Sequence, residues 1–284
     1  MVVACGAVSD DSRRTGRAGP TVRRVAATRR EIRSRSVGPL RVGSPHRGTS
    51  GQRGRPPSAA CRTVGLMPLT FVGTLDRGAL LWAVDAVVAL VSAPAVAETW
   101  DQESALSGMT VGGLTRHLVS QPECAVEFLG IQPVPPHAPT VSLADLYART
   151  DWFLAPVDAA ENTSIVDDFN AMAAGGPSQS VATLEGARAA LPEAIAAAAP
   201  TTYVPWQDCC LATDDFLVVR MMEIVVHADD LAASVGWQTP VFDAEVMDPA
   251  LALLATLSSR RHGQDRSIRA LARAERSNGP AAAF

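Results

Sequence analysis

The sequence predicts an all-α protein, an antiparallel bundle of four main helices with short extra helices. The stretch Thr213–Gly236 keeps a helical pattern of apolar residues throughout, and the runs 110–129 and 178–199 combine helix-start residues with helix-forming composition. No strand-rich region, dinucleotide-binding fingerprint or phosphate loop occurs in the 284 residues. Long amphipathic helices without strands favour a bundle.

Charge and composition divide the chain near residue 67. Residues 1–66 hold 14 arginines and 3 acidic residues, whereas the remainder holds 11 arginines and 26 acidic residues. The first part lacks aromatic residues and has few large apolar ones, so we expect a disordered Arg-rich leader. Either it is a basic arm for nucleic acid or membrane, or the true start is Met67, which we favour. The bundle then spans 67–240, with a short helical extension over 241–284.

The cysteines argue against a disulfide framework, because their number is odd and no CxxC pair occurs. A reducing cytosol, and hence a cytoplasmic protein, is the expected setting. The five are Cys5, Cys61, Cys124, Cys209 and Cys210.

The apolar run over 70–99 has three interpretations. It ends in Ala95-Val96-Ala97, which is similar to a signal-peptidase site, but the basic stretch before it is too long for a signal peptide. A membrane span would need about 20 apolar residues, and Asp85 lies near the middle of this run. We therefore predict an amphipathic first helix over 71–92 that ends before Pro94.

Caps and breakers predict the other elements. Thr110 is expected to cap the helix over 110–129, and Pro122 to kink or divide it. Thr213 is expected to cap the long helix, which Gly236 ends. The remaining predictions are a loop over 130–141, a helical segment over 142–153 started by Thr140 or Ser142 and broken by Pro156, a weak helix over 165–173, a helix from Ser178 or Ser180 to Ala199, a loop or short extended piece over 200–212, a helix from Asp248-Pro249 to Arg261 and a short helix over 267–276.

A polar stripe runs along the long helix. Arg220, Glu223, His227, Asp230 and Ser234 are spaced 3, 4, 3 and 4 apart, which places them within an arc of about 80°. The rest of that helix is apolar, so it should be buried. Burying such a stripe is costly unless its members pair or bind a ligand.

The spacing of Glu223 and His227 allows both to bind one cation, although Glu-x-x-x-His is common by chance. The alternative is a Glu–His pair, or an Arg220–Glu223 salt bridge, on a solvated face. His117 is the other histidine on a confidently apolar helix, and Cys124 lies about 10 Å from it along that helix, too far for the same ion.

A His, Glu and His site with an open fourth position is typical of catalytic zinc, and nickel or ferrous iron would also accept these ligands. The open position would take water or a thiolate and lower its pKa. Asp230 and Arg220 lie about one turn to either side. They would orient an imidazole, bind a substrate carboxylate or bridge neighbouring helices.

Two motifs carry a family resemblance. MTVGGLTRHLVSQPECAVEFL is similar to the second-helix signature of the mycothiol-dependent maleylpyruvate isomerase N-terminal domain family, a branch of the DinB/YfiT-like metalloenzyme bundles. RMMEIVVHADDLAASVGW resembles that family's other signature, Arg-x-x-Glu-x-x-x-His-x-x-Asp-Leu followed by Gly. The resemblance covers roughly 70–240. It implies a four-helix bundle and a divalent metal, usually zinc, bound by His117, Glu223 and His227.

The resemblance also implies a low-molecular-weight thiol, mycothiol, as cosubstrate, and thiol-dependent isomerisation or S-transfer on a small electrophile. The isomerase itself carries a further C-terminal domain, and only 48 residues follow Gly236 here, so we do not expect maleylpyruvate isomerisation. We do not expect nucleic-acid or membrane partners, and a homodimer stays open.

Two alternatives compete with this enzyme hypothesis. The first is a non-catalytic metal- or ligand-binding regulatory module. The second is a nucleic-acid or membrane-surface protein, which depends wholly on residues 1–66.

Overall fold

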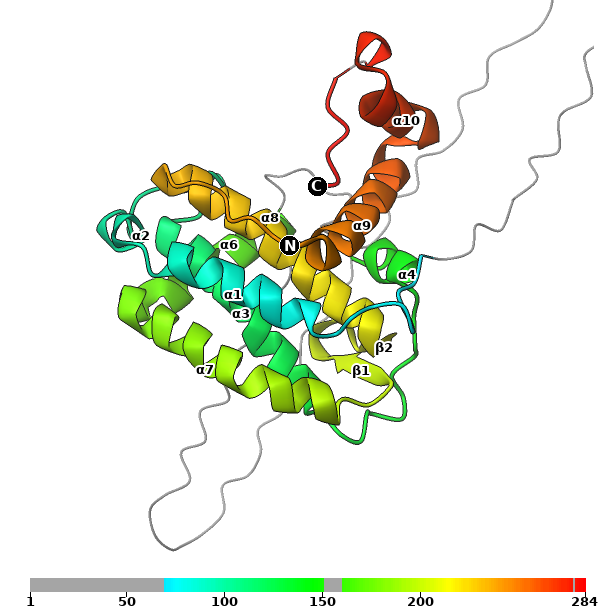
Figure 1. The fold of residues 1–284 in the computed structure, drawn as a ribbon, viewed down its shortest axis with the longest axis horizontal. Helices are drawn as coiled ribbons and strands as arrows, with labels where there is room; N and C mark the ends of the chain where they lie inside the picture. Colours follow the sequence, from blue (N-terminus) through cyan, green and yellow to red (C-terminus); the bar gives the residue numbers. More distant parts are fainter. Residues whose placement is uncertain (1–68, 151–159, 278) are drawn as a thin grey trace, which may run out of the picture. The chain divides into compact units, whose positions relative to one another are not determined.

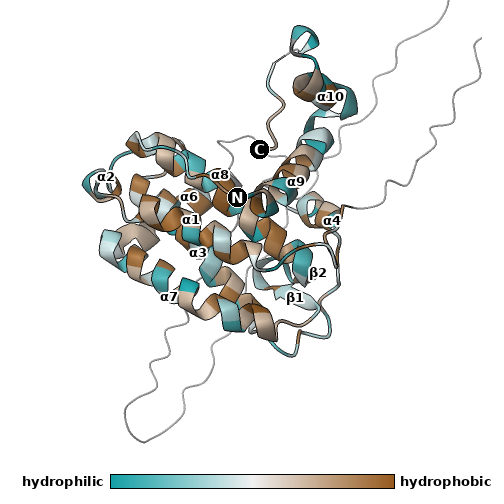
Figure 2. Cartoon of the chain, viewed as in Figure 1, coloured by the Kyte–Doolittle hydropathy of each residue, from teal (hydrophilic) through white to brown (hydrophobic). Residues whose placement is uncertain are grey.

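The computed structural model describes residues 69–150, 160–277 and 279–284. Its main elements are four helices, α1 (Ala79–Val91), α3 (Val111–Leu129), α7 (Gly176–Ala197) and α8 (Thr213–Val235) (Figure 1). Helices α3 and α1 each contact both α7 and α8, so the four form a bundle. Figure 2 shows hydrophobic residues on each of these helices. The predicted all-α fold is confirmed. The predictions for residues 1–66 and Pro156 lie outside the described residues.

Helix α3 packs against three other helices, α6 (Ala160–Met172), α7 and α8. Thr110 caps it as predicted, because its side chain accepts a hydrogen bond from the Gly113 backbone at 2.9 Å. The expected division at Pro122 does not occur, since the helix continues for 19 residues through it. Nearly all of α3 is buried, and this packing outweighs the roughly 3 kcal/mol that an interior proline costs.

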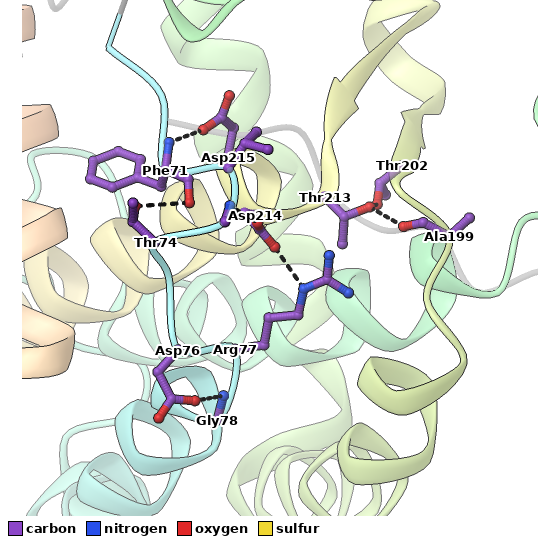
Figure 3. A network of polar contacts seen from close by, with 12 residues as sticks. Phe71, Thr74, Asp76, Arg77, Gly78, Ala199, Thr202, Thr213, Asp214 and Asp215 are labelled. Atoms are coloured by element: carbon purple, nitrogen blue, oxygen red, sulfur yellow. Dashed lines mark hydrogen bonds and ion pairs between the residues drawn. The ribbon is translucent and has the colours of Figure 1, made fainter.

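The first helix begins later than predicted, at Ala79 instead of residue 71. The preceding backbone is held by the first turn of α8 (Figure 3). The amide of Phe71 donates to Asp215 at 2.6 Å, and that of Gly73 donates to Asp214 at 2.9 Å. Because these backbone amides donate to side-chain carboxylates, they do not form the backbone hydrogen bonds of a helix. The helix ends at Val91, and Pro94 begins the short α2 (Pro94–Glu98).

Other helix starts also differ from the prediction, including that of α6, which begins at Ala160 instead of residue 165. Helix α7 begins at Gly176, and Ser180 lies buried inside it instead of capping it. Thr213 is the first residue of α8, not its cap, because its hydroxyl donates to the carbonyl of Ala199 at 2.6 Å (Figure 3). Helix α9 (Ala244–His262) begins before Asp248 and includes Pro249. Gly236 ends α8 with φ of 65°, as expected.

The remaining elements are short. Ser142 caps α4 (Leu143–Ala148), and Met172 is followed by a 3-10 turn over Ala173–Gly175. The stretch predicted as a loop or short extended piece forms an antiparallel hairpin of β1 (Thr201–Val204) and β2 (Cys209–Ala212). The last helix is α10 (Gln264–Ala272), shifted from the predicted 267–276, with a 3-10 turn over Ala274–Arg276. No helix in the described ranges is long and apolar enough to cross a membrane.

The Thr110 cap should contribute measurably to stability. We expect Thr110→Ala to lower the free energy of unfolding by about 1 kcal/mol, because the Gly113 amide loses its acceptor. Urea denaturation of the full chain measures this. Ser178→Ala is the matched control, since Ser178 is exposed within α7, and it should change stability little. Equal losses in the two variants would contradict the helix starts described above.

Candidate metal centre

Three potential metal ligands meet between α3 and α8. His117 comes from α3, and Glu223 and His227 come from successive turns of α8. One ligand atom from each lies within 4.8 Å of the others. Their exposed fractions are 0%, 2% and 5%. The solvated Glu–His pair considered from the sequence is therefore excluded, because these side chains are buried.

Glu223 lies between the two imidazoles. Its Oε2 is 3.1 Å from His227 Nε2 and 4.0 Å from His117 Nε2. Burial would raise the pKa of Glu223, but the hydrogen bond with His227 and the positive charges nearby lower it. A deprotonated carboxylate with imidazole nitrogens on two sides is a suitable set of donors for a divalent cation.

The strongest indication that this cluster binds a ligand comes from His117. Neither of its ring nitrogens has a hydrogen-bond partner in the part of the chain that the structure describes. Burial and the neighbouring His227 keep the pKa of His117 well below its usual value, so the ring is neutral at pH 7. Phe169 of α6 stacks on this ring at 4.2 Å between centroids and 13° between planes, which fixes its orientation. A neutral, fixed imidazole is a metal donor in its binding form.

His227 is oriented by a carboxylate on its other side. Its Nδ1 lies 3.0 Å from Asp230 Oδ2, which favours a proton on Nδ1 and leaves Nε2 directed at Glu223. Burial lowers the pKa of His227, but hydrogen bonds with Asp230 and Glu223 outweigh it and raise that pKa. Nε2 and Glu223 Oε2 are 3.1 Å apart, so either a proton on Nε2 or a metal ion between the two atoms makes this contact favourable.

Arg220 does not form the salt bridge with Glu223 that the sequence left open. Its Nη1 instead donates to Gln121 Oε1 of α3 at 2.9 Å. Its guanidinium carbon lies 5.4 Å from the ring centre of Phe216 and 6.0 Å from that of Trp206. The side chain thus lies near two aromatic rings, one helical turn from Glu223.

Two further residues near the cluster, Tyr147 and Phe169, could not be predicted from the sequence. Tyr147 of α4 is buried, and that burial with the negative charge of Glu223 raises its pKa. Neither Tyr147 nor Phe169 lies on a long helix with a clear polar stripe. Gln121 could have been found, because it follows His117 by one turn. Cys124 is a buried core residue, as expected.

The residues present fit a divalent metal ion. Two imidazoles and one carboxylate converge from two helices, and the buried nitrogens of His117 otherwise lack partners in the described ranges. Burying such a group without a partner costs about 1–3 kcal/mol, and a metal ion would remove that cost.

Comparison with known proteins gives a match to one family. A family model described as the mycothiol maleylpyruvate isomerase N-terminal domain matches residues 80–232, more than half of the chain. The matched range includes all three candidate ligands. Neither a curated protein nor a solved structure matches the chain.

The unpartnered imidazole predicts a stability effect in metal-free protein. We expect His117→Leu to raise the free energy of unfolding by about 1–2 kcal/mol in the presence of a chelator, because an apolar side chain removes buried polar atoms that lack partners. Urea denaturation at neutral pH measures this. Leu114→Ala on the same helix, also fully buried, is the contrast and should lose about 2–5 kcal/mol. A loss in His117→Leu as large as in Leu114→Ala would show that the imidazole is satisfied without metal.

Proposed function

Because this chain belongs to the mycothiol maleylpyruvate isomerase N-terminal domain family, we propose that it binds a divalent metal ion, most simply zinc, through His117, Glu223 and His227. We further propose that it is an enzyme that joins or transfers a low-molecular-weight thiol, mycothiol, to a small electrophile. The observation that carries the proposal is the convergence of these three buried donors within 4.8 Å.

The donor set supports an open site. Three protein ligands leave room for one more, as in catalytic zinc centres, whereas structural zinc sites use four. The three described cysteines, which are free and buried, do not belong to this cluster. A bound divalent ion would lower the pKa of a thiol or a water molecule at that open position.

The chain's own residues prepare the site for that chemistry. Asp230 holds the proton on Nδ1 of His227, so the Nε2 lone pair stays available. Phe169 keeps the ring of His117 in one plane against the cluster. The surrounding core keeps bulk water away from Glu223, which strengthens its attraction for a cation.

The proposed reaction is a nucleophilic addition in which the thiolate sulfur bonds to an electrophilic carbon, such as that of an epoxide or an alkene. The C–O bond or the C=C π bond at that carbon breaks, and the proton lost by the thiol ends on the oxygen or carbon that receives the electron pair. Buried free thiols at Cys124, Cys209 and Cys210 agree with our proposal that the protein works in a reducing cytosol.

Metal analysis of the purified full chain tests the ligand set. We expect stoichiometric zinc in the wild type and loss of most of it in His117→Ala, Glu223→Ala and His227→Ala, because each removes one of three donors. His137→Ala is the matched control, since that histidine is exposed in a loop beside Asp208. Full zinc content in any of the three ligand variants would contradict the ligand assignment.

The same samples decide between enzyme and binding module. The zinc-loaded protein should accelerate consumption of mycothiol by electrophiles such as epoxides or maleyl compounds, and a chelator should abolish the effect. Zinc binding without thiol consumption across these electrophiles would instead identify a non-catalytic metal-binding module.

A further inference from the structure

Charge is unevenly distributed along the C-terminal arm, by which we mean α9, α10 and the residues beside them over 243–276. Residues 243–259 hold three acidic residues and no basic one, whereas residues 260–276 hold six arginines and two acidic residues. Helix α10 packs chiefly against α9, and Figure 1 shows it beyond the end of α9, away from the four main helices. The arm is therefore acidic at its start and basic at its far end.

Helix α10 exposes an apolar face. Ile268 and Leu271 are 52% and 74% exposed and, three residues apart, lie on the same side of the helix. The rest of its exposed surface carries Arg266, Arg269 and Arg273. An apolar face accompanied by arginines suits a partner surface that combines apolar and acidic side chains.

Such a surface lies at the start of the arm. A hollow of about 410 Å³ forms between the backbone before α1 and the first turns of α9. Its apolar side chains include Phe71 and Leu75, both half-buried, and its acidic side chains are exposed, at Asp76, Glu245 and Asp248. None of the residues that line it is basic. The hollow therefore complements α10 in both polarity and charge.

The α10 of the same chain cannot occupy this hollow. From Asp248 to its last residue, α9 rises about 21 Å, which separates the hollow from α10. The C-terminal tail keeps α10 beside the end of α9. Ser258 Oγ of α9 donates to the carbonyl of Ala281 at 2.6 Å. Arg266 Nη2 of α10 donates to the carbonyl of Pro280 at 2.8 Å. A second copy of the chain can supply the helix instead.

The exposed side of α9 allows two copies to meet. Residues spaced four, three and four apart share this side, namely Ala244, Asp248, Leu251 and Ala255. Leu251 is 52% exposed, and the small alanines let a second helix approach closely. Packing two such helices antiparallel, about a two-fold axis near Ala255, would place the acidic start of each arm beside the basic end of the other.

We propose that the chain forms a two-fold symmetric dimer in which Ile268 and Leu271 of each α10 bind in the hollow of the other copy. The arginines of α10 then lie near Asp76, Glu245 and Asp248. A single nine-residue helix buries too little surface for a stable complex, but the two-fold axis repeats the contact and adds the pairing of the two α9 helices. None of these residues belongs to the candidate metal centre, so the interface goes beyond the proposed function.

Sedimentation equilibrium of the full chain measures the dimer. We expect a wild-type dimer with a micromolar dissociation constant that high salt weakens, because the contact pairs opposite charges. Leu271→Asp should weaken the dimer about tenfold or more, because it removes an apolar side chain from both contacts. Val241→Asp is the matched control, since that valine is 85% exposed outside the interface, and it should leave the dissociation constant unchanged.

Charge exchange separates the proposed contact from a general attraction. Glu245→Arg with Asp248→Arg, or Arg269→Glu with Arg273→Glu, should weaken the dimer, since like charges then meet. A chain with all four substitutions should regain much of the wild-type affinity, because the charges match again. Far-UV circular dichroism and zinc content should equal those of wild type throughout, because all four side chains are exposed and lie outside the metal cluster.

The proposal is overturned if the wild type stays monomeric up to about 1 mM, or if Leu271→Asp and Val241→Asp dissociate alike. A fourfold variant as weak as its two parents would also overturn it. A monomeric wild type that binds phosphatidylglycerol vesicles, with binding lost in Leu271→Asp, would assign the apolar face of α10 to a lipid surface instead.

Discussion

The central constraint on this structure is that the core of its helical bundle contains one carboxylate and two imidazoles. His117, Glu223 and His227 lie where α3 and α8 pack, and water cannot satisfy them there. Hydrogen bonds account for part of the cluster, since His227 contacts Glu223 on one side and Asp230 on the other. His117 is not satisfied by the described residues. A cation between the three donors would resolve this conflict, because it would bind all of them at once.

The first turn of α8 secures the helix that carries two of the candidate ligands. Asp214 and Asp215 hold the backbone over 71–73, and Arg77 lies 2.6 Å from Asp214. Acidic groups at this end also favour the helix dipole. The chain before α1 is thereby tied to the start of α8, so the register of the ligand-bearing helix is fixed from its N-terminal end.

The bundle and the grouping of the candidate ligands could both be predicted from the sequence, because both follow from the spacing of residues along helices. The stripe on α8 is visible from spacing alone, and burial cost pointed from it to His117 on another apolar helix. The helix starts were less predictable. Thr213 has the residue type of a cap, but its hydroxyl bonds to Ala199, a tertiary contact that no local pattern reveals. Tyr147 likewise reaches the site from a six-residue helix.

For Arg220, helical periodicity predicted the position on the helix but not the hydrogen-bond partner. Its place on the stripe was evident, but its partner was not, because Gln121 is brought to it only by the packing of α3 on α8. The alternative considered from the sequence, a salt bridge with Glu223, does not form, and that carboxylate instead contacts His227. The Arg220–Gln121 pair thus forms a second polar layer beside the candidate metal ligands, within an otherwise apolar core.

X-ray absorption spectroscopy of the zinc-loaded full chain, without added thiol, tests the central claim most directly. The account predicts nitrogen and oxygen ligands about 2.0–2.2 Å from zinc, with scattering from two imidazoles. A protein sulfur ligand at about 2.3 Å, or the absence of imidazole scattering, would contradict it.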